Sequence, residues 1–445
     1  MNASVNIYGK RERGLNMNRL MPFLLTSLAV ASIFSFFLAY SPNPIPITSK
    51  EALNSVVHDQ NLQPDRDHLS HAAPVRLIPP PKKKEVCDLF KGQWVPDSRG
   101  PLYTNSTCKT IPESKDCFKN GRMDRDYLNW RWKPEKCELP EFDPKAFLEI
   151  VRGKKMAFVG DSVARNHFES LLCLLSQEEL CTAVNLISYM SCDLCLEELP
   201  KDIYKDSEDR FRTWYFPQHD FTLMKLWTKY LIAADERMDN VTGSGVFDLS
   251  IDKIDDEWGK HLPDLDYVII SDGHWFFRVL YLYKGNKLIG CVYCNQPNIT
   301  GFNTGNAVRM AFRSAFKYIS TCKNCKVGLL TILRTFAPAH FENGAWNTGG
   351  YCNRTSPFSE AEVDFTKLDW EMRNIQIKEI KGARRNNGKQ IRVLDITRAM
   401  LMRPDGHPGI HWGNQWMKGY SDCVHWCMPG PVDYWNNFLI ALIRN

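Results

Sequence analysis

Ser162 stands in the motif Gly160-Asp161-Ser162, directly after the apolar run Met156–Val159. Far downstream, Asp422 and His425 lie three residues apart, close enough for one turn of the chain to present both on the same side. A serine hydroxyl becomes an effective nucleophile when a base takes its proton, and that base needs a carboxylate to orient it. We therefore predict nucleophilic catalysis with Ser162 as nucleophile, His425 as base and Asp422 as the orienting carboxylate.

Each of these short motifs also has a structural interpretation. Ser162 stands where the N-cap of a helix belongs, and capping is the commoner use of a serine at such a position. A metal site is a further alternative, because possible ligands occur near the C-terminus at His407, His411, Asp422 and His425. Their spacing matches no standard zinc pattern, so no metal is expected.

The residues around Ser162 predict a buried strand followed by an amphipathic helix. Met156–Val159 is apolar, and apolar side chains recur with helical spacing from Ala164 to Leu175. Further strands are predicted at Tyr267–Ser271, Val327–Leu333 and Ile391–Ile396, with helices at Ala307–Tyr318 and Phe365–Ile380. This alternation predicts an α/β fold in which helices flank a parallel sheet.

The topology of residues 182–262 stays open at this point. Phe211–Phe216 and Phe221–Trp227 both have the composition of strands. They can pair as a hairpin, or one of them can supply a strand to the main sheet.

Polar residues follow three of the predicted strands. Asp272-Gly273-His274-Trp275 follows the first, Arg334 and then residues 341–350 follow the second, and residues 403–408 follow the third. Open α/β sheets bind ligands at the carboxyl ends of their strands. We therefore expect these segments to converge with Ser162 at one edge of the sheet.

Composition limits the classes of protein that fit. The chain has 445 residues, of which 44% are hydrophobic, so it can bury a large core in at most a few domains. Its formal net charge is only +5, and no long basic run is interleaved with aromatic residues, so nucleic acid is not an expected partner. Tryptophan and tyrosine are numerous, and their flat rings suit the faces of sugars as well as a core.

The N-terminus has the pattern of a membrane anchor. Residues 20–40 are uncharged and long enough to span a bilayer, and they follow the basic residues Lys10, Arg11, Arg13 and Arg19. The positive-inside rule then makes residues 1–19 a cytosolic tail and places the rest in the lumen. A cleaved signal peptide is the alternative. Residues 41–84 are rich in proline and polar residues and predict a stem.

Cysteines and glycosylation sequons agree with a lumenal location. All fifteen cysteines follow the apolar segment, and disulfides form in the oxidising secretory pathway. Four sequons lie on the same side, at Asn105, Asn240, Asn298 and Asn353. Together these features predict a type II membrane glycoprotein of the Golgi.

A cysteine-rich segment at residues 85–141 precedes the α/β pattern, which occupies residues 142–445. The segment shows little helix or strand periodicity and is expected to be stapled by disulfides against the larger domain. Its Trp130-Arg131-Trp132 motif is either a platform for sugar or a packing element. Three C-x-x-C pairs occur later and fit disulfides better than zinc: Cys192/Cys195, Cys291/Cys294 and Cys322/Cys325.

Several motifs in the same order resemble the plant trichome birefringence-like family. They are Gly160-Asp161-Ser162 with Val163–Asn166, Arg334-Thr335 leading to Gly344–Asn347, and Asp422–Gly430. The resemblance extends from about Cys87 to the C-terminus. It implies a Golgi polysaccharide O-acetyltransferase with a fold similar to GDSL/SGNH esterases, and it supports the roles assigned to Ser162, His425 and Asp422.

The resemblance also implies a disulfide pattern and an acceptor. The implied bonds are Cys87–Cys137, Cys108–Cys173, Cys117–Cys427 and Cys352–Cys423. Residues 162–166 and 169–175 look most similar to the branch associated with xyloglucan, so xyloglucan is the first choice of acceptor. Xylan, mannan and pectin are alternatives, as are a carbohydrate acetylesterase and a non-catalytic wall-polysaccharide-binding protein.

Double displacement through an acetylated Ser162 is the expected mechanism, with an acetyl donor of unknown identity as co-substrate and no bound cofactor. The Ser162 N–H is the first candidate for an oxyanion donor. Gly273 and Asn347 are further candidates for this role, whereas Arg165 or Asn166 is expected to support the loop instead. Candidates for substrate binding are Trp275, Arg334, Trp346 and Trp412.

Overall fold

The computed structural model describes residues 87–444 apart from 188–198, 240–241, 388–389 and 414–418. The predicted cytosolic tail, membrane anchor and stem lie outside the described residues. Within the described part of the chain, no helix combines the length and the apolar character that crossing a membrane requires.

A seven-stranded sheet forms the centre of a mixed α/β fold. Its strand order is β13-β12-β9-β3-β6-β5-β4. The strands from β13 to β6 run parallel to one another, whereas β5 is antiparallel to β6 and β4 is antiparallel to β5. The bounds are β3 Lys155–Gly160, β4 Lys201–Lys205, β5 Phe211–Phe216, β6 Phe221–Trp227, β9 Tyr267–Ser271, β12 Leu330–Arg334 and β13 Gln390–Leu394.

Strand β3 is the point at which the order of the sheet reverses. It pairs with β6 on one side and with β9 on the other, so that Gly160 lies opposite both Trp227 and Ser271. The chain adds β6 and its hairpin partner β5 on one side of β3, and β9, β12 and β13 on the other. Ligands of open α/β sheets bind outside the carboxyl ends of strands at such a switch point. Ser162, which follows β3 directly, occupies that position.

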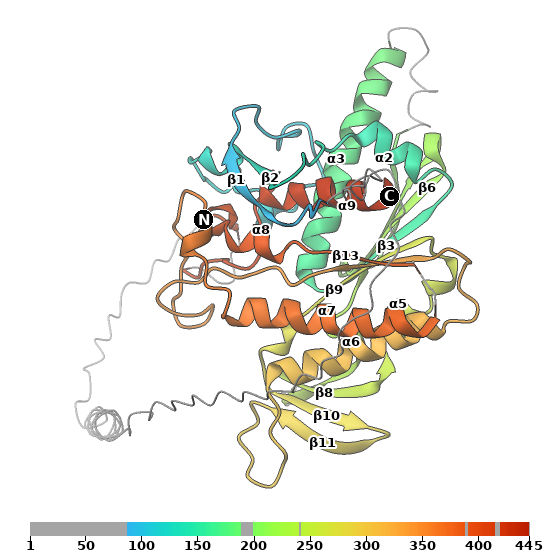
Figure 1. Cartoon of the computed structure of the whole chain (residues 1–445), viewed down its shortest axis with the longest axis vertical. Helices are drawn as coiled ribbons and strands as arrows, with labels where there is room; N and C mark the ends of the chain where they lie inside the picture. The colour runs from blue at the N-terminus through green and yellow to red at the C-terminus, as the bar shows by residue number, and fades with distance from the viewer. Residues whose placement is uncertain (1–86, 188–198, 240–241, 388–389, 414–418, 445) are drawn as a thin grey trace, which may run out of the picture. The chain divides into compact units, whose positions relative to one another are not determined.

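Helices cover both faces of this sheet (Figure 1). Helices α3 (Ser162–Ile187) and α9 (Tyr434–Arg444) pack on the face that carries Phe158. Helices α6 (Thr304–Thr321) and α7 (Leu368–Asn387) lie side by side on the opposite face, and the side chains of Ala157 and Val159 point to them. The alternation of neighbouring side chains along β3 therefore supplies two separate cores. The shorter helices are α2 Pro144–Ile150, α5 Asp256–Gly259 and α8 Thr397–Leu401.

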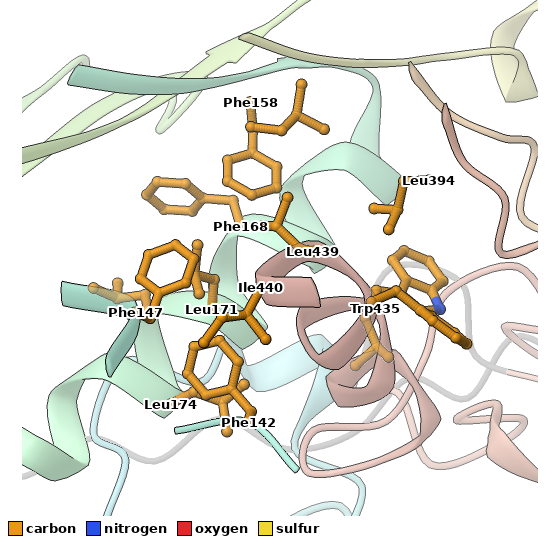
Figure 2. Packing of buried hydrophobic residues seen from close by; sticks show 14 of the residues in the cluster. Phe142, Phe147, Phe158, Phe168, Leu171, Leu174, Leu394, Trp435, Leu439 and Ile440 are labelled. Atoms are coloured by element: carbon orange, nitrogen blue, oxygen red, sulfur yellow. The ribbon is translucent and has the colours of Figure 1, made fainter. Parts of the chain in front are cut away.

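The first of these cores fixes the helix that begins at Ser162. Phe158 of β3 and Phe168 of α3 meet edge to face with their ring centroids 6.1 Å apart. Figure 2 shows these rings with Leu171 of α3 and Ile440 of α9 in one packed cluster. All four side chains are almost completely buried. Because close packing resists displacement, the start of α3 is held firmly against the end of β3.

A second sheet of four strands is inserted around β9 and was not anticipated from the sequence. Its order is β11-β10-β8-β7. The bounds are β7 Ile232–Asp239, β8 Thr242–Ile254, β10 Leu280–Lys284 and β11 Lys287–Val292. The two stretches left open, Phe211–Phe216 and Phe221–Trp227, form β5 and β6, which pair as a hairpin and both join the main sheet.

The cysteine-rich segment contains a short antiparallel pair of strands despite its weak periodicity. Strands β1 (Gly92–Pro96) and β2 (Trp130–Pro134) form this pair. The indole N–H of Trp94 donates to the carbonyl of Ala399 at 2.7 Å, and Trp132 is almost fully buried. Trp132 is therefore a packing residue, and long-range contacts with the larger domain stabilise strands that local periodicity did not reveal.

The predicted strands and helices are present with shifted ends. The strand expected at Val327–Leu333 begins later, at Leu330, because Val327 is fully exposed and Gly328 adopts a positive φ of 92°. The strand expected at Ile391–Ile396 ends at Leu394, since Ile396 already caps α8.

Candidate active site

Folding brings Ser162, His425 and Asp422 into hydrogen-bonding contact. The Ser162 Oγ lies 2.8 Å from the Nε2 of His425, and the Nδ1 of His425 lies 2.8 Å from a carboxylate oxygen of Asp422. Because the carboxylate can only accept, the proton of a neutral His425 sits on Nδ1. The lone pair of Nε2 is then free to accept the Ser162 hydroxyl proton.

Asp422 is held as a buried carboxylate. One of its oxygens accepts from the backbone N–H groups of Val424 and His425, and the other accepts from the His425 ring. Burial alone would raise the pKa of Asp422, but the charge and hydrogen bonds of His425 outweigh burial and hold the pKa well below its usual range. Asp422 therefore stays ionised whenever His425 needs an orienting partner.

The turn between β3 and α3 has no room for a side chain at Gly160. A Cβ atom there would lie 1.5 Å from the carbonyl oxygen of Ser271, and Gly160 has a φ of 147°. Only glycine tolerates both conditions. The requirement for glycine in this motif thus comes from the close approach of β9.

Asp161 caps α3, which corrects the expectation that Ser162 is the cap. The Oδ1 of Asp161 accepts from the N–H groups of Val163 and Ala164, while Ser162 is the first residue of the helix. Asp161 takes the capping position because it precedes the first helical residue, so its carboxylate can accept from the N–H groups of the first turn that follows. This arrangement leaves the Ser162 hydroxyl to His425 and does not use the Ser162 N–H.

A second carboxylate–imidazole pair lies directly beside the nucleophile. The Oδ2 of Asp161 accepts from the backbone N–H of His274 at 3.1 Å and lies 3.0 Å from its Nδ1. The Nε2 of His274 faces the carbonyl oxygen of Ala337 at 2.9 Å. Burial alone would raise the pKa of Asp161, but His274 and Arg334 hold it well below its usual range. The sequence placed His274 at this edge of the sheet but did not reveal its partner.

Three contacts fix the segment that carries His425. The Asn166 Oδ1 accepts from the N–H of Trp426 at 2.8 Å, which ties this segment to α3. Two disulfides supply the other contacts. Cys352–Cys423 anchors the chain before His425, and Cys117–Cys427 anchors it after His425. Asn166 therefore acts on the loop, one of the two roles considered for it.

All four disulfides implied by the family resemblance are present. The remaining two are Cys87–Cys137 and Cys108–Cys173, of which the latter joins the cysteine-rich segment to α3. Cys291–Cys294 and Cys322–Cys325 are also bonded, as their C-x-x-C spacing predicted. The third such pair, Cys192/Cys195, lies outside the described residues.

Two further histidines, the buried His407 and the partly buried His340, form a hydrogen-bonded chain to the backbone of His425. The Nδ1 of His407 lies 2.6 Å from the carbonyl oxygen of His425, and its Nε2 lies 2.7 Å from the Nδ1 of His340. His411 instead contacts the carbonyl oxygen of Asn120. Across the described residues, no group of three or more His, Cys, Asp or Glu side chains is arranged to hold a metal ion.

The other oxyanion candidates occupy different environments. The Gly273 N–H donates to the carboxylate of Asp272 at 2.6 Å, so it is engaged in this structure. Arg165 is half-buried on α3, one turn after the nucleophile. Asn347 is exposed in the loop 341–350, which Cys352–Cys423 tethers to the segment that carries Asp422.

The substrate-binding candidates divide into interior and surface residues. Arg334 is 1% exposed and lies over the ring of Trp435, so it cannot touch a polysaccharide directly. Its burial lowers its pKa to about 10, although Asp161 and Asp272 oppose this shift. Trp275 packs edge-on against Trp227 and is half-buried.

Two tryptophans remain available near the surface. Trp346 is 55% exposed in the loop 341–350. Trp412 is half-buried, donates its indole N–H to the carbonyl of Tyr420, and follows Gly409, which forms an isolated β-bridge with Asp422. Both tryptophans thus belong to segments tied to the triad. The sequons at Asn105, Asn298 and Asn353 are exposed, and Asn240 lies outside the described residues.

Comparison with known proteins gives matches over nearly the whole described chain. Residues 139–442 match the GDSL/SGNH-like acyl-esterase family found in Pmr5 and Cas1p, and residues 85–138 match the PMR5 N-terminal domain. A protein named xyloglucan O-acetyltransferase 4 from Populus trichocarpa is 53% identical over 98% of this chain and 95% of its own length. The chain belongs to the trichome birefringence-like family.

Other trichome birefringence-like relatives extend this comparison. One named xyloglucan O-acetyltransferase 2, from Arabidopsis thaliana, is 50% identical over 98% of this chain and 96% of its own length. Protein trichome birefringence-like 20 from the same plant is 42% identical over 81% of this chain and 73% of its own length. The family resemblance seen in the sequence motifs is therefore confirmed.

Proposed function

We propose that this protein is a Golgi O-acetyltransferase that transfers acetyl groups to xyloglucan through an acetylated Ser162. The observation that carries this proposal is the continuous hydrogen-bonded relay from the Ser162 hydroxyl through His425 to the buried Asp422. The relatives that match almost the full chain are named xyloglucan O-acetyltransferases, which supports both the acetyl group and the acceptor.

The relay supports a double displacement in which every proton has a place. The Oγ of Ser162 attacks the acetyl carbonyl of the donor while its proton moves to the Nε2 of His425. His425 then gives this proton to the leaving group, and acetyl-serine remains. A sugar hydroxyl next loses its proton to His425 as its oxygen attacks the acetyl carbon. Collapse releases the acetylated sugar and returns the proton to the Ser162 oxygen.

Both displacements pass through an oxyanion that needs hydrogen-bond donors. The Ser162 N–H is our first candidate, because the Asp161 cap does not use it and it lies at the positive end of the α3 dipole. One such donor contributes roughly 2.7–4 kcal/mol to the transition state. Gly273 would have to release Asp272 to take part, and Asn347 would act through movement of its exposed loop.

The acceptor would lie along the segments tied to the triad. Trp346, which is exposed, and Trp412, which is half-buried, are the two predicted binding residues in segments with a covalent or backbone link to the Asp422 segment. Stacking of sugar rings on such side chains would favour a glycan hydroxyl over water as the second nucleophile. We further propose a type II topology, with residues 20–40 as the membrane anchor, the catalytic domain in the lumen and an acetyl donor as co-substrate.

Peptide mass spectrometry after exposure to an acetyl donor tests this function. The purified full chain is incubated with an activated acetyl ester, and we expect acetyl on Ser162. The Ser162→Ala variant should show none, whereas Ser176→Ala, on the same helix, should label normally. Absence of the adduct in the native chain would contradict the proposal.

A panel of oligosaccharides then tests the acceptor. We expect acetylated xyloglucan oligosaccharide and little product with xylan, mannan or pectin fragments. Activity on xylan alone would refute xyloglucan as acceptor. Release of acetate without any acetylated sugar would make the protein an esterase. Binding of glycan by a protein whose Ser162 acquires no acetyl group would make it a polysaccharide-binding protein.

A further inference from the structure

The ring of His274 connects the carboxyl ends of three neighbouring strands. Its Nδ1 lies 3.0 Å from the Oδ2 of Asp161, which follows β3, and its Nε2 lies 2.9 Å from the carbonyl oxygen of Ala337, which lies beyond β12. His274 itself follows β9, and its backbone N–H donates to the same Asp161 oxygen at 3.1 Å. Strands β3, β9 and β12 are adjacent in the sheet, so one imidazole contacts the segments that follow all three.

Packing holds this ring in place. It stacks on Phe336 with the ring centroids 4.5 Å apart and the planes inclined by 17°. The preceding residue, Gly273, has a φ of 145°, and a Cβ atom there would lie 2.8 Å from the Phe336 ring. The side chain of His274 is only 11% exposed. The stacked ring therefore presents its two nitrogens to two fixed oxygen atoms.

Both of these oxygen atoms act as acceptors. A backbone carbonyl carries no hydrogen. Asp161 accepts from the backbone N–H groups of Val163, Ala164 and His274, which favours its ionised form. A neutral imidazole has a single N–H and could make only one of the two hydrogen bonds. The ring makes both when each nitrogen carries a hydrogen, which is the imidazolium form.

The other acidic groups close to this pair favour protonation. Burial and the charge of Asp161 raise the pKa of Asp272 well above its usual range. Burial also raises the pKa of Asp369, which lies on the His274 side of the pair. The pKa of Asp161 instead lies well below its usual range, because His274 and Arg334 outweigh its burial. Asp161 is thus the carboxyl of this group that is most readily ionised.

Arg334 is the second cation near Asp161. Its guanidinium lies over the ring of Trp435, and its Nε and Nη2 have no hydrogen-bond partner among the described residues. Burial lowers its pKa to about 10, so Arg334 stays charged at neutral pH. With a neutral His274, the charges of Asp161 and Arg334 would cancel. An imidazolium at His274 leaves one net positive charge.

We propose that His274 is a positioning residue, held as an imidazolium, that acts through Asp161 to keep the start of α3 positive where the oxyanion of each acetyl transfer forms. This inference rests on the proposed function. A carboxylate at a helix N-terminus offsets the positive end of the helix dipole, so Asp161 alone would weaken the Ser162 N–H as an oxyanion donor. The His274 cation offsets this charge while Asp161 continues to cap α3.

Nuclear magnetic resonance of the full chain, labelled with ¹⁵N-histidine, tests the protonation state. We expect both ring nitrogens of His274 to carry a hydrogen at pH 7. The His274→Gln variant identifies the signal by its loss. A ring with only one protonated nitrogen would overturn the proposal.

The His274→Phe variant removes the charge and keeps a ring to stack on Phe336. We expect kcat for acetyl transfer to fall roughly 10- to 100-fold with little change in KM, because the oxyanion forms only after the substrate binds. His219→Phe is the matched control. His219 is also buried and lies 3.4 Å from the Glu149 carboxylate, but it precedes β6, at the opposite end of the sheet strands. Native kcat is expected in His219→Phe, and native kcat in His274→Phe would overturn the proposal.

Addition of Asp161→Asn to His274→Phe separates charge from structure. The double variant loses both members of the pair but leaves the Arg334 charge without a counter-charge, so the net positive charge returns. We expect its kcat to exceed that of His274→Phe by about fivefold or more. A purely structural role predicts that the double variant is no faster than His274→Phe, and that result would overturn the proposal.

Acetylation of Ser162 in the native chain keeps the two proposals distinguishable. Absence of the acetyl group from Ser162 would refute the proposed function, whereas the resonance measurement would still report the charge of His274. Normal acetylation of Ser162 in a chain whose His274 is neutral would refute only the role of His274.

Discussion

At the scale of single residues, two aspartates with similar environments perform different tasks. Asp422 contacts the ring of His425, which we propose it orients, whereas Asp161 caps α3 and pairs with His274. Both are buried, and both have a lowered pKa because an imidazole faces each carboxylate. The nucleophile thus lies between two carboxylate–imidazole pairs, of which only one contacts its hydroxyl.

Asp422→Asn tests the orienting role. The amide keeps the size of the side chain but removes the charge and can hold His425 in the wrong tautomer. We expect kcat/KM for acetyl transfer to fall by roughly 10²- to 10⁴-fold, measured in steady-state assays. Asp364→Asn, at an exposed position, should leave the rate unchanged. A loss of less than tenfold in Asp422→Asn would show that Asp422 does not orient the base.

The His407→Phe variant tests whether the contact between His407 and the backbone carbonyl of His425 positions the catalytic base. The change removes the hydrogen-bonding ring nitrogen that faces the His425 carbonyl. Because His425 acts in the transition state, we expect kcat to fall by about tenfold with little change in KM. His411→Phe removes a comparable contact, to Asn120, and should have no such effect. A rise in KM alone would assign His407 to substrate binding.

At the scale of elements, the site is built where β3, α3 and the Asp422–Cys427 segment meet. The sheet reverses its order at β3, and open α/β sheets bind ligands outside the carboxyl ends of strands at such a point, where α3 begins. The Asp422–Cys427 segment has no regular secondary structure. Disulfides and the Asn166 contact supply the rigidity that a helix or strand would otherwise give.

Removal of the Cys117–Cys427 disulfide tests this role. The paired Cys→Ser variant opens a link between residues 310 positions apart. We expect a loss of roughly 2–5 kcal/mol in unfolding free energy, measured by urea titration, together with slower acetyl transfer. The double variant Cys322→Ser and Cys325→Ser opens a link between residues only three positions apart, so we expect a smaller loss of unfolding free energy. Equal losses in both double variants would contradict a special role for the longer link.

Local sequence periodicity predicted some of the strands and helices and missed others. The periodicity of Met156–Leu175 was sufficient to predict β3 and the start of α3, because both bury a regular face in the core. The inserted sheet was missed although two of its pairings, β7–β8 and β10–β11, are local hairpins and only the pairing of β8 with β10 joins distant residues. Charged residues interrupt the apolar pattern in Ile232–Asp239 and Thr242–Ile254, so local periodicity did not reveal these strands. Strands β1 and β2 were missed because contacts with the larger domain stabilise them.

At the scale of the whole molecule, two hydrophobic cores on opposite faces of one sheet hold these elements together. Buried carboxyl groups in this molecule have pKa values shifted in opposite directions. Asp161 and Asp422 favour the ionised form, whereas burial raises the pKa of Asp433 to about 6. The molecule therefore contains carboxyl groups whose effects on stability have opposite dependence on pH.

Asp161→Asn tests the sign of this dependence. A carboxyl with a lowered folded-state pKa binds its proton less tightly when folded, so its contribution is present above about pH 3.9 and is lost at lower pH. We expect the difference in unfolding free energy between the native chain and Asp161→Asn to shrink from pH 7 to pH 3.

Asp433→Asn provides a control of opposite sign. The raised pKa of Asp433 means that the folded state binds this proton more tightly. Its stabilising effect is therefore present below about pH 3.9 and is lost as pH rises to about 6. The native chain should lose stability relative to Asp433→Asn between pH 4 and pH 7. Parallel pH profiles for the two variants would contradict the opposite shifts.

Local sequence patterns predicted the parallel part of the central sheet, the strand and helix around Ser162 and the meeting of Ser162 with His425 and Asp422, and the family motifs predicted four disulfides. These features depend on local periodicity and on residue types whose chemistry restricts their use. Only the packed fold showed that Asp161 rather than Ser162 caps α3, that His274 pairs with Asp161, and that Arg334 is interior. Each of these depends on side chains far apart in the chain, and only the packed fold sets their distances.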